Sequence, residues 1–334
     1  MPQKSRSKKD HRVLLLTIDD ILVQNRNILP DSYGEKRFTS NAKMLRTLVV
    51  ALLLPEVTFG ILNGLSVSPS ETRSLVKLSP TFSFYAPDEF AVCGGVLISQ
   101  TVVLTAAHCV MEEKEYSPLV DVTMIDYHPE APEKKKLAPS EFIEVFSGFD
   151  DNVRGDKDVG FVFIPKTWKC RNSSGPHVAR LPPQILQKAG LKAKEKPITD
   201  KEIEKAECYA LGWGMTEDEG YATKPQRIYL HVERDIYIGL LGYPVNSTKA
   251  CQGDSGSPVY CSIRGRKYLI GVMTDVGAFS PVELGRDDNI NCEKYEFVII
   301  ADIRASAQKI IDILKTRNEV DRMLESQKNC VEEM

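Results

Sequence analysis

The sequence predicts an all-β protein with a helix near its C-terminus, and two patterns support this prediction. From about residue 72 to residue 303, short runs of β-branched and aromatic residues are separated by turn residues, as in a β-sandwich or β-barrel. Near the C-terminus, apolar residues recur at roughly helical spacing among charged residues, which indicates an amphipathic helix. The 334 residues of the chain allow two domains.

The predicted strands are short. They include residues 95–98, 102–104, 159–164, 209–211, 259–262 and 268–273. Residues 111–140 and 278–291 are polar, so we expect both to be inserted loops. The helical stripe runs from Ile310 to Leu324. It could dock a partner, but we expect its first half to pack on the body, as amphipathic stripes usually do.

The composition argues against some classes of partner. A formal net charge of -3 with 27% charged residues gives no electrostatic basis for binding nucleic acid or an anionic membrane. Basic residues cluster within residues 4–9 and 134–136, which we interpret as a solvated tail and a solvated loop.

The eight cysteines include no CxxC pair, and no group of histidines and cysteines has the spacing of a zinc site. We therefore predict no metal and no other cofactor. An even number of scattered cysteines is typical of disulfides formed in an oxidising compartment. Sequons at Asn172 and Asn246 agree with such a compartment and are candidate glycosylation sites.

Residues 44–60 resemble a secretory signal peptide that begins at an internal methionine. A basic residue precedes a short apolar run, and residues 57–60 offer small side chains for signal peptidase. The apolar run ends at Pro55, so we expect no stable membrane insertion. Two alternatives are a buried N-terminal element and a membrane anchor over residues 47–65. Residues 1–43 are an extension with no assigned role, and the predicted location is extracellular.

Three separate segments carry residues that suit nucleophilic catalysis. Ser255 follows an acid and lies among glycines, which would let backbone N–H groups approach a substrate oxygen. His108 ends an apolar run far upstream, and Asp158 leads into an apolar strand between them. A serine hydroxyl needs a base to take its proton, and the base needs a carboxylate to fix its tautomer. Each residue alone is more often structural, but together they predict a catalytic triad.

Several motifs resemble those of the chymotrypsin/trypsin-like serine proteases. They are CGGVLIS at residues 93–99, TAAHC at 105–109, GWG at 212–214 and GDSG at 253–256. The resemblance covers about residues 61–316 and is specific because the motifs occur together.

This resemblance implies two six-stranded antiparallel Greek-key β-barrels, with the site in the cleft between them, and a C-terminal α-helix. The implied parts are a first barrel over about residues 61–168, a linker over about 169–185, a second barrel over about 186–304, a helix from about 305 and a tail over 317–334.

By the same resemblance, His108 is the general base, Asp158 the acid that orients it and Ser255 the nucleophile. The backbone N–H groups of Gly253 and Ser255 would form the oxyanion hole. Asp158 is preferred to Asp156 because the family's acid stands directly before the apolar strand. The substrate would be a protein or peptide, and protein inhibitors are a further class of partner.

The resemblance also implies disulfides. They join Cys93 to Cys109, Cys208 to Cys261 and Cys251 to Cys292. Cys170 and Cys330 are left over. They either pair, which would tie the C-terminal tail to the linker, or remain free thiols.

In this family a new N-terminus inserts into the protein, and its α-ammonium pairs with the acid before the nucleophile. That acid is Asp254, and Ile61 begins a segment that resembles the N-terminal motif. No Lys or Arg precedes Ile61, but the predicted signal-peptidase site does. We therefore expect signal removal to expose Ile61 and complete the Ile61–Asp254 ion pair without a separate zymogen step.

Family geometry places the floor of the specificity pocket at Lys249 and its walls at Val276 and Val298. Lys249 disfavours basic substrate side chains, and it either attracts an acidic one or turns its ammonium to solvent. The valines would narrow the pocket, so we expect small or acidic residues before the scissile bond. Asp275 replaces a common tryptophan in the substrate-binding strand, whereas Thr274 can offer a hydroxyl toward the acid of the triad.

The sequence thus predicts a secreted serine endopeptidase that works through an acyl-enzyme and is not trypsin-like in specificity. Because the pocket departs from the family's pattern, one alternative is retained. It is a catalytically inactive homologue that acts as a binding or inhibitory module through a blocked cleft. No oligomeric state is predicted.

Overall fold

The computed structural model describes most of the chain from residue 61 onward. The described stretches are residues 61–82, 91–112, 114–124, 134–150, 155–164, 170, 176–192, 195–216, 220–279 and 292–331. The chain divides into two units, Met1–Glu56 and Val57–Met334, and all described residues belong to the second. The N-terminal extension, the predicted signal peptide and Asn172 lie outside the described residues.

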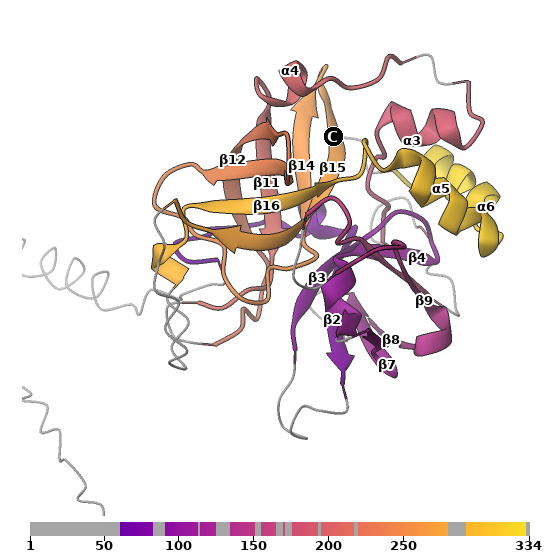
Figure 1. The fold of residues 1–334 in the computed structure, drawn as a ribbon, viewed down its shortest axis with the longest axis horizontal. Helices are drawn as coiled ribbons and strands as arrows, with labels where there is room; N and C mark the ends of the chain where they lie inside the picture. Colours follow the sequence, from indigo (N-terminus) through magenta and orange to yellow (C-terminus); the bar gives the residue numbers. More distant parts are fainter. Residues whose placement is uncertain are drawn as a thin grey trace, which may run out of the picture. The chain divides into compact units, whose positions relative to one another are not determined.

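The first barrel is an antiparallel sheet with strand order β8-β7-β2-β3-β4-β10-β9, coloured indigo to magenta in Figure 1. Its strands are β2 (Leu75–Thr81), β3 (Cys93–Leu97), β4 (Val102–Thr105), β7 (Leu119–Met124), β8 (Lys134–Pro139), β9 (Ile143–Val145) and β10 (Gly160–Phe163). The central strands β3 and β4 are buried along their whole length. In β7 every second residue is buried, as expected for a strand with one face on a core.

The second barrel is an antiparallel sheet with strand order β1-β12-β11-β14-β15-β16-β13. Its strands are β1 (Leu65–Ser66), β11 (Glu207–Gly212), β12 (Gln226–Asp235), β13 (Gly239–Pro244), β14 (Pro258–Ile263), β15 (Arg266–Gly277) and β16 (Phe297–Asp302). Strand β12 also pairs with β13, which closes the sheet. The predicted all-β fold with two antiparallel barrels is confirmed. One boundary differs, because β1 precedes the first barrel but pairs with β12 of the second.

Short helices connect and cover the barrels. The α-helices are α3 (Pro183–Lys188), α4 (Asp200–Ile203), α5 (Ala307–Thr316) and α6 (Val320–Asn329), and the 3-10 helices are η2 (Pro69–Thr72), η3 (Ala107–Cys109), η4 (Ser140–Phe142) and η5 (Cys292–Lys294). Helices α3, α5 and α6 lie together beside the barrels in Figure 1.

The C-terminal helical pattern forms two helices rather than one. The chain turns between α5 and α6 at Asn318, which has a φ of 57° that asparagine tolerates well. Ile310, Leu314 and Met323 are buried in the same core cluster as barrel residues. The apolar stripe therefore packs on the body as expected, and the segment predicted as a tail carries α6.

The prediction of an inserted loop over residues 111–140 is wrong. This stretch forms a small hairpin of β5 (Met111–Glu112) and β6 (Glu115–Tyr116), followed by β7 and β8. Strand β7 has the alternation of a half-buried strand, but the high lysine, glutamate and proline content around it obscured that pattern.

One core cluster contains buried residues of both barrels. It includes Leu104 and Phe161 of the first barrel and Leu211 and Trp213 of the second, all of them buried. Because the barrels share this packed cluster, loops that leave them in the same direction can hold fixed positions relative to one another.

Candidate active site

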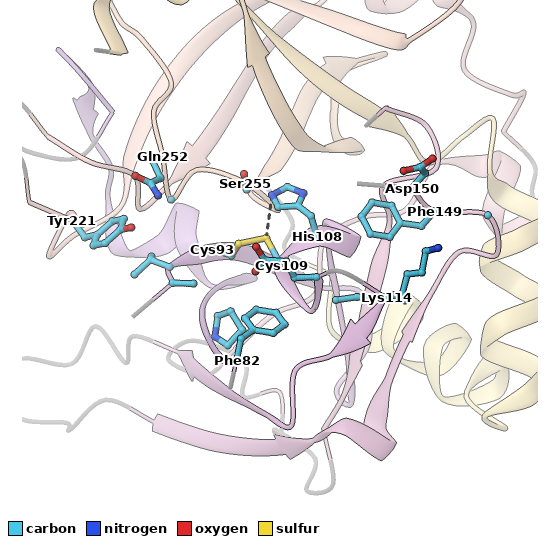
Figure 2. Close-up of a pocket in the computed structure, with 17 residues that line it drawn as sticks. Phe82, Cys93, His108, Cys109, Lys114, Phe149, Asp150, Tyr221, Gln252 and Ser255 are labelled. Carbon is cyan, nitrogen blue, oxygen red and sulfur yellow. Dashed lines mark hydrogen bonds between the residues drawn. A yellow bond between two sulfur atoms is a disulfide. The ribbon is translucent and has the colours of Figure 1, made fainter. Parts of the chain in front are cut away.

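The structure brings the candidate catalytic residues from both barrels to one site. His108 lies in η3 directly after β4, Asp158 lies just before β10, and Ser255 lies in the turn that precedes β14. His108 and Ser255 both line a cavity of about 1080 Å³, which Figure 2 shows in close-up.

Asp158 holds the His108 imidazole in place through two contacts. Its Oδ2 lies 2.7 Å from His108 Nδ1, and its Oδ1 accepts a hydrogen bond from the His108 backbone N–H at 3.0 Å. The Asp158 side chain is fully buried. A carboxylate beside Nδ1 keeps the proton on that nitrogen, so Nε2 is left to accept another. The dashed line in Figure 2 marks the 4.0 Å contact between His108 Nε2 and Cys109 Sγ.

Close backbone packing fixes the turn that carries Ser255. Gly94 N–H donates to Ser255 O at 2.7 Å, and Gly256 N–H donates to Met273 O at 2.7 Å. Gly256 has a φ of 75°, and a Cβ there would lie only 2.3 Å from Gly94 O, so glycine is required. The Ser255 side chain is half-buried, and its hydroxyl makes no hydrogen bond with any residue that the structure describes.

The two expected oxyanion-hole donors are available. Within the described stretches, the backbone N–H groups of Gly253 and Ser255 donate to no acceptor. Gly253 has a φ of 94°, and a Cβ there would lie 2.8 Å from Tyr221 Cε1. This turn therefore needs glycine for its conformation and for the space beside Tyr221.

The Asp254 carboxylate is buried and has no cationic partner among the described residues. It accepts hydrogen bonds from the backbone N–H groups of Gly214 at 2.8 Å and Cys251 at 2.9 Å. Burial raises the pKa of Asp254 to about 7, although these hydrogen bonds and one from the Trp213 backbone lower it.

Ile61 lies inside the second barrel, but it forms no ion pair with Asp254 in the intact chain. Its side chain is fully buried, and its nitrogen belongs to the peptide bond with residue 60. The neighbouring Leu62 exchanges two backbone hydrogen bonds with Lys249, each 3.0 Å long. These bonds anchor the segment at the base of the serine-bearing loop.

A second cavity of about 190 Å³ adjoins Ser255. It is lined by Ala250, Cys251, Gln252, Asp254, Ser255, Met273, Asp275, Val276 and Tyr295. Val276 thus lies on its wall, whereas the expected residues Lys249 and Val298 are absent from the lining. Lys249 Nζ donates to Tyr295 O at 2.7 Å, and Val298 is buried in the core of the second barrel.

The Thr274 hydroxyl does not reach toward Asp158 as expected. It donates to Ile299 O at 3.3 Å, at the point where the register of β15 and β16 shifts between Met273 and Asp275. Asp275 Oδ1 accepts a hydrogen bond from the backbone of the following residue at 2.9 Å.

The eight cysteines form four disulfides. The pairs are Cys93–Cys109, Cys208–Cys261, Cys251–Cys292 and Cys170–Cys330. The last pair, left open by the sequence, ties the chain before α3 to the end of α6. Cys93 and Cys109 lie near His108, but both sulfurs belong to a disulfide, so they offer no thiolate to a metal.

Aromatic residues that no motif indicated also line the large cavity. Phe82 and Tyr221 lie on the side of the Cys93–Cys109 disulfide and Ser255, whereas Phe149 lies beyond His108 (Figure 2). They come from loops without a recognisable pattern, so only the fold identifies them as cleft residues.

Comparisons with known proteins agree on one family. The family described as Trypsin matches residues 79–281. Chymotrypsin-like elastase family member 1 of Homo sapiens is 23% identical over 67% of this chain and 84% of that protein. Tissue-type plasminogen activator of Homo sapiens is 26% identical over 57% of this chain and 35% of that protein. A structure of HL collagenase has a TM-score of 0.55 at 21% identity and covers 77% of this chain and 99% of that chain.

The chain belongs to the trypsin family of chymotrypsin-like serine proteases, because the family match covers more than half of it. This membership supports proteolysis as its general activity and protein as its class of substrate. Within the described residues, no helix is both long enough and apolar enough to cross a membrane.

Proposed function

We propose that this protein is a serine endopeptidase in which His108, Asp158 and Ser255 form the catalytic triad. The observation that carries the proposal is the 2.7 Å contact between His108 Nδ1 and Asp158 Oδ2, at a cavity that Ser255 shares. A histidine oriented by a carboxylate can take the proton of a serine hydroxyl that shares its cavity once the two groups come within hydrogen-bond reach.

In the proposed mechanism, Ser255 Oγ attacks the carbonyl carbon of the scissile peptide bond while His108 Nε2 takes its proton. Asp158 stabilises the resulting imidazolium. The N–H groups of Gly253 and Ser255 bind the oxyanion of the tetrahedral intermediate. His108 then protonates the leaving amine, and water hydrolyses the acyl-enzyme by the same steps in reverse. The missing Ser255–His108 hydrogen bond is compatible with this scheme, because such bonds often tighten only when substrate binds.

A fluorophosphonate probe tests the proposal directly. We expect the probe to label the wild-type protein and to leave Ser255→Ala unlabelled, because only an activated serine hydroxyl attacks phosphorus at a useful rate. Labelling is read by intact mass and by peptide mapping. A folded, correctly processed wild type that stays unlabelled would favour the inactive binding homologue, an alternative to which the comparisons lend no support.

We further propose that the enzyme accepts a small, uncharged residue before the scissile bond and is not trypsin-like. Val276 narrows the cavity beside Ser255, and the Lys249 ammonium is bonded to the Tyr295 carbonyl and so is not offered to an acidic side chain. Of the two earlier options, small residues therefore fit better than acidic ones.

Replacing Val276 with glycine should let the enzyme accept larger residues before the scissile bond. We expect the ratio of kcat/KM for a large apolar residue to that for alanine at this substrate position to rise about 10- to 100-fold, since a pocket methyl group is worth roughly 1–3 kcal/mol. A peptide library with one varied position measures this ratio. Val232→Ala is the matched control, because Val232 lies in the core of the second barrel and outside the cavity lining, so its replacement should change stability without changing the preference. An unaltered ratio in Val276→Gly would contradict the proposed pocket.

The route to the active enzyme is also a proposal. We propose that signal removal after residue 60 frees Ile61, whose α-ammonium then pairs with Asp254, and that the protein is secreted with glycans on Asn172 and Asn246. Asn246 is exposed in the loop after β13, where a glycan can be accommodated. Protein inhibitors remain a proposed class of partner.

A further inference from the structure

We infer that Asp156 and Arg234 form a clasp that positions Asp158 against His108. The clasp connects the turn before β10, which belongs to the first barrel, with β12 and β16 of the second barrel. Asp156 is the acid that the sequence left without a role beside Asp158. The inference rests on the proposed function, which gives Asp158 its part in catalysis.

Three contacts bind the turn to the second barrel through Asp156. Asp302 N–H donates to Asp156 Oδ1 at 2.8 Å, Asp156 N–H donates to Ile238 O at 3.3 Å, and Asp156 Oδ2 lies 3.6 Å from Arg234 Nη1. Asp158 N–H then donates to Gly155 O at 2.9 Å within the same turn. Only one residue separates the anchored Asp156 from Asp158, so a displacement of Asp156 would also move Asp158.

Two glycines permit this close approach. Gly155 has a φ of 140°, and a Cβ there would lie 2.4 Å from Ile238 O. Gly239 has a φ of 131°, and a Cβ there would lie 2.6 Å from Asp156 Oδ1. Because neither position carries a side chain, the turn can approach the β12–β13 hairpin closely enough to form the contacts of Asp156.

The cation of the clasp is itself held by other carboxylates. Arg234 is paired with the buried Asp302, and its Nε lies 3.6 Å from Asp200 Oδ2. Arg304 binds the same two carboxylates, at 2.8 Å from Asp302 Oδ2 and 2.7 Å from Asp200 Oδ1. Burial raises the pKa of Asp156 and the Asp302 charge adds to this rise, whereas the hydrogen bond from Asp302 N–H and the charges of Arg234 and Arg304 lower the pKa without reversing the rise.

A positioning role differs from a stabilising role in what it changes. A residue that only stabilises the barrels alters the fraction of folded protein, whereas a positioning residue alters the His108–Asp158 hydrogen bond within folded protein. The Nδ1 proton of a histidine bonded to a carboxylate resonates at low field in proton NMR. This signal reports the hydrogen bond without requiring catalysis.

The test uses the processed protein, with kcat and KM for a peptide substrate and the low-field His108 proton as readouts. Asp156→Ala should lower kcat about 10- to 100-fold with little change in KM, because displacing a catalytic group by roughly 1 Å has effects of this size. Its low-field signal should shift or broaden. Asp156→Asn keeps an acceptor for Asp302 N–H and should restore most of the activity and the signal.

Glu233→Gln is the matched control, because Glu233 is an exposed carboxylate next to Arg234 on β12 and lies outside the clasp, and we expect wild-type kcat and signal from it. If Asp156→Ala fails to fold, Arg234→Gln tests the clasp in its place. We expect its kcat to fall about three- to tenfold and its low-field His108 signal to shift or broaden. A wild-type signal in the folded Asp156→Ala or, failing that, in Arg234→Gln would overturn the clasp. If fluorophosphonate leaves the wild type unlabelled while the signal changes as expected, the proposed function fails and the clasp stands.

Discussion

Replacing His108 with alanine is expected to lower kcat/KM by about 10⁵-fold, since removing a triad histidine removes the base that the other two residues serve. Labelling of Ser255 by a fluorophosphonate should slow in parallel, because the hydroxyl then keeps its proton. Steady-state kinetics on a peptide with alanine before the scissile bond, and the rate of labelling, measure the two losses.

Asp158→Asn refines this test because it keeps the shape of the buried side chain. The neutral amide accepts a hydrogen bond from Nδ1–H less well than the carboxylate does, and it supplies no negative charge to stabilise the imidazolium. We therefore expect kcat to fall by about 10⁴-fold. His231→Ala is the matched histidine control, because His231 is exposed on β12, and it should retain kcat/KM within about twofold. If His108→Ala kept more than a few per cent of the wild-type rate, the proposed triad would be wrong.

The all-β class could be predicted from the residue pattern, whereas the two barrels and the meeting of the candidate residues were implied by the resemblance of the motifs to a family. Glycines beside Ser255 signal a turn that only glycine can make, and the apolar run before His108 signals a buried strand that ends at the site. Their convergence was not derivable from spacing, because Ser255 and His108 lie on different barrels. The resemblance to a family supplied that step.

Other features depend on side-chain directions that no motif encodes. Lys249 was expected at a pocket floor, but its flexible stem lets the ammonium reach the Tyr295 carbonyl instead. The Thr274 hydroxyl donates to Ile299 O beside a register shift between β15 and β16, and sequence spacing cannot reveal such a shift. The contact of Asp156 with Arg234 joins residues far apart in the chain, and single charged residues give no signal of their partners.

The unprocessed chain is expected to lose stability as pH rises from about 4 to about 7, because of Asp254. In the folded chain the pKa of this buried carboxyl is raised to about 7 from an ordinary value of 3.8. Between these values the folded state holds a proton that the unfolded state has released, so the free energy of unfolding falls with pH. The full difference corresponds to about 4 kcal/mol, and above pH 7 the loss is complete and constant.

Urea unfolding of the full chain at several pH values, beside Asp254→Asn, measures this contribution. The asparagine stays neutral, so the difference between the two proteins isolates Asp254 from every other titrating group. A pH dependence identical in both proteins would contradict the unpaired carboxylate.

Processing should remove this pH-dependent loss, because a free α-ammonium at Ile61 would compensate the ionised Asp254 inside the barrel. Protein recovered from culture medium, with its glycans removed enzymatically, should begin at Ile61 by N-terminal sequencing and should be stable at pH 7. Acetylating that amine should restore the loss and reduce labelling of Ser255, since an unpaired charge beneath Gly253 and Ser255 disfavours the backbone arrangement that binds the oxyanion. A secreted protein that starts elsewhere, or one whose acetylated form labels at the original rate, would show that the cation for Asp254 does not come from Ile61. The turn that carries Ser255 would then have to form around a protonated, uncharged Asp254.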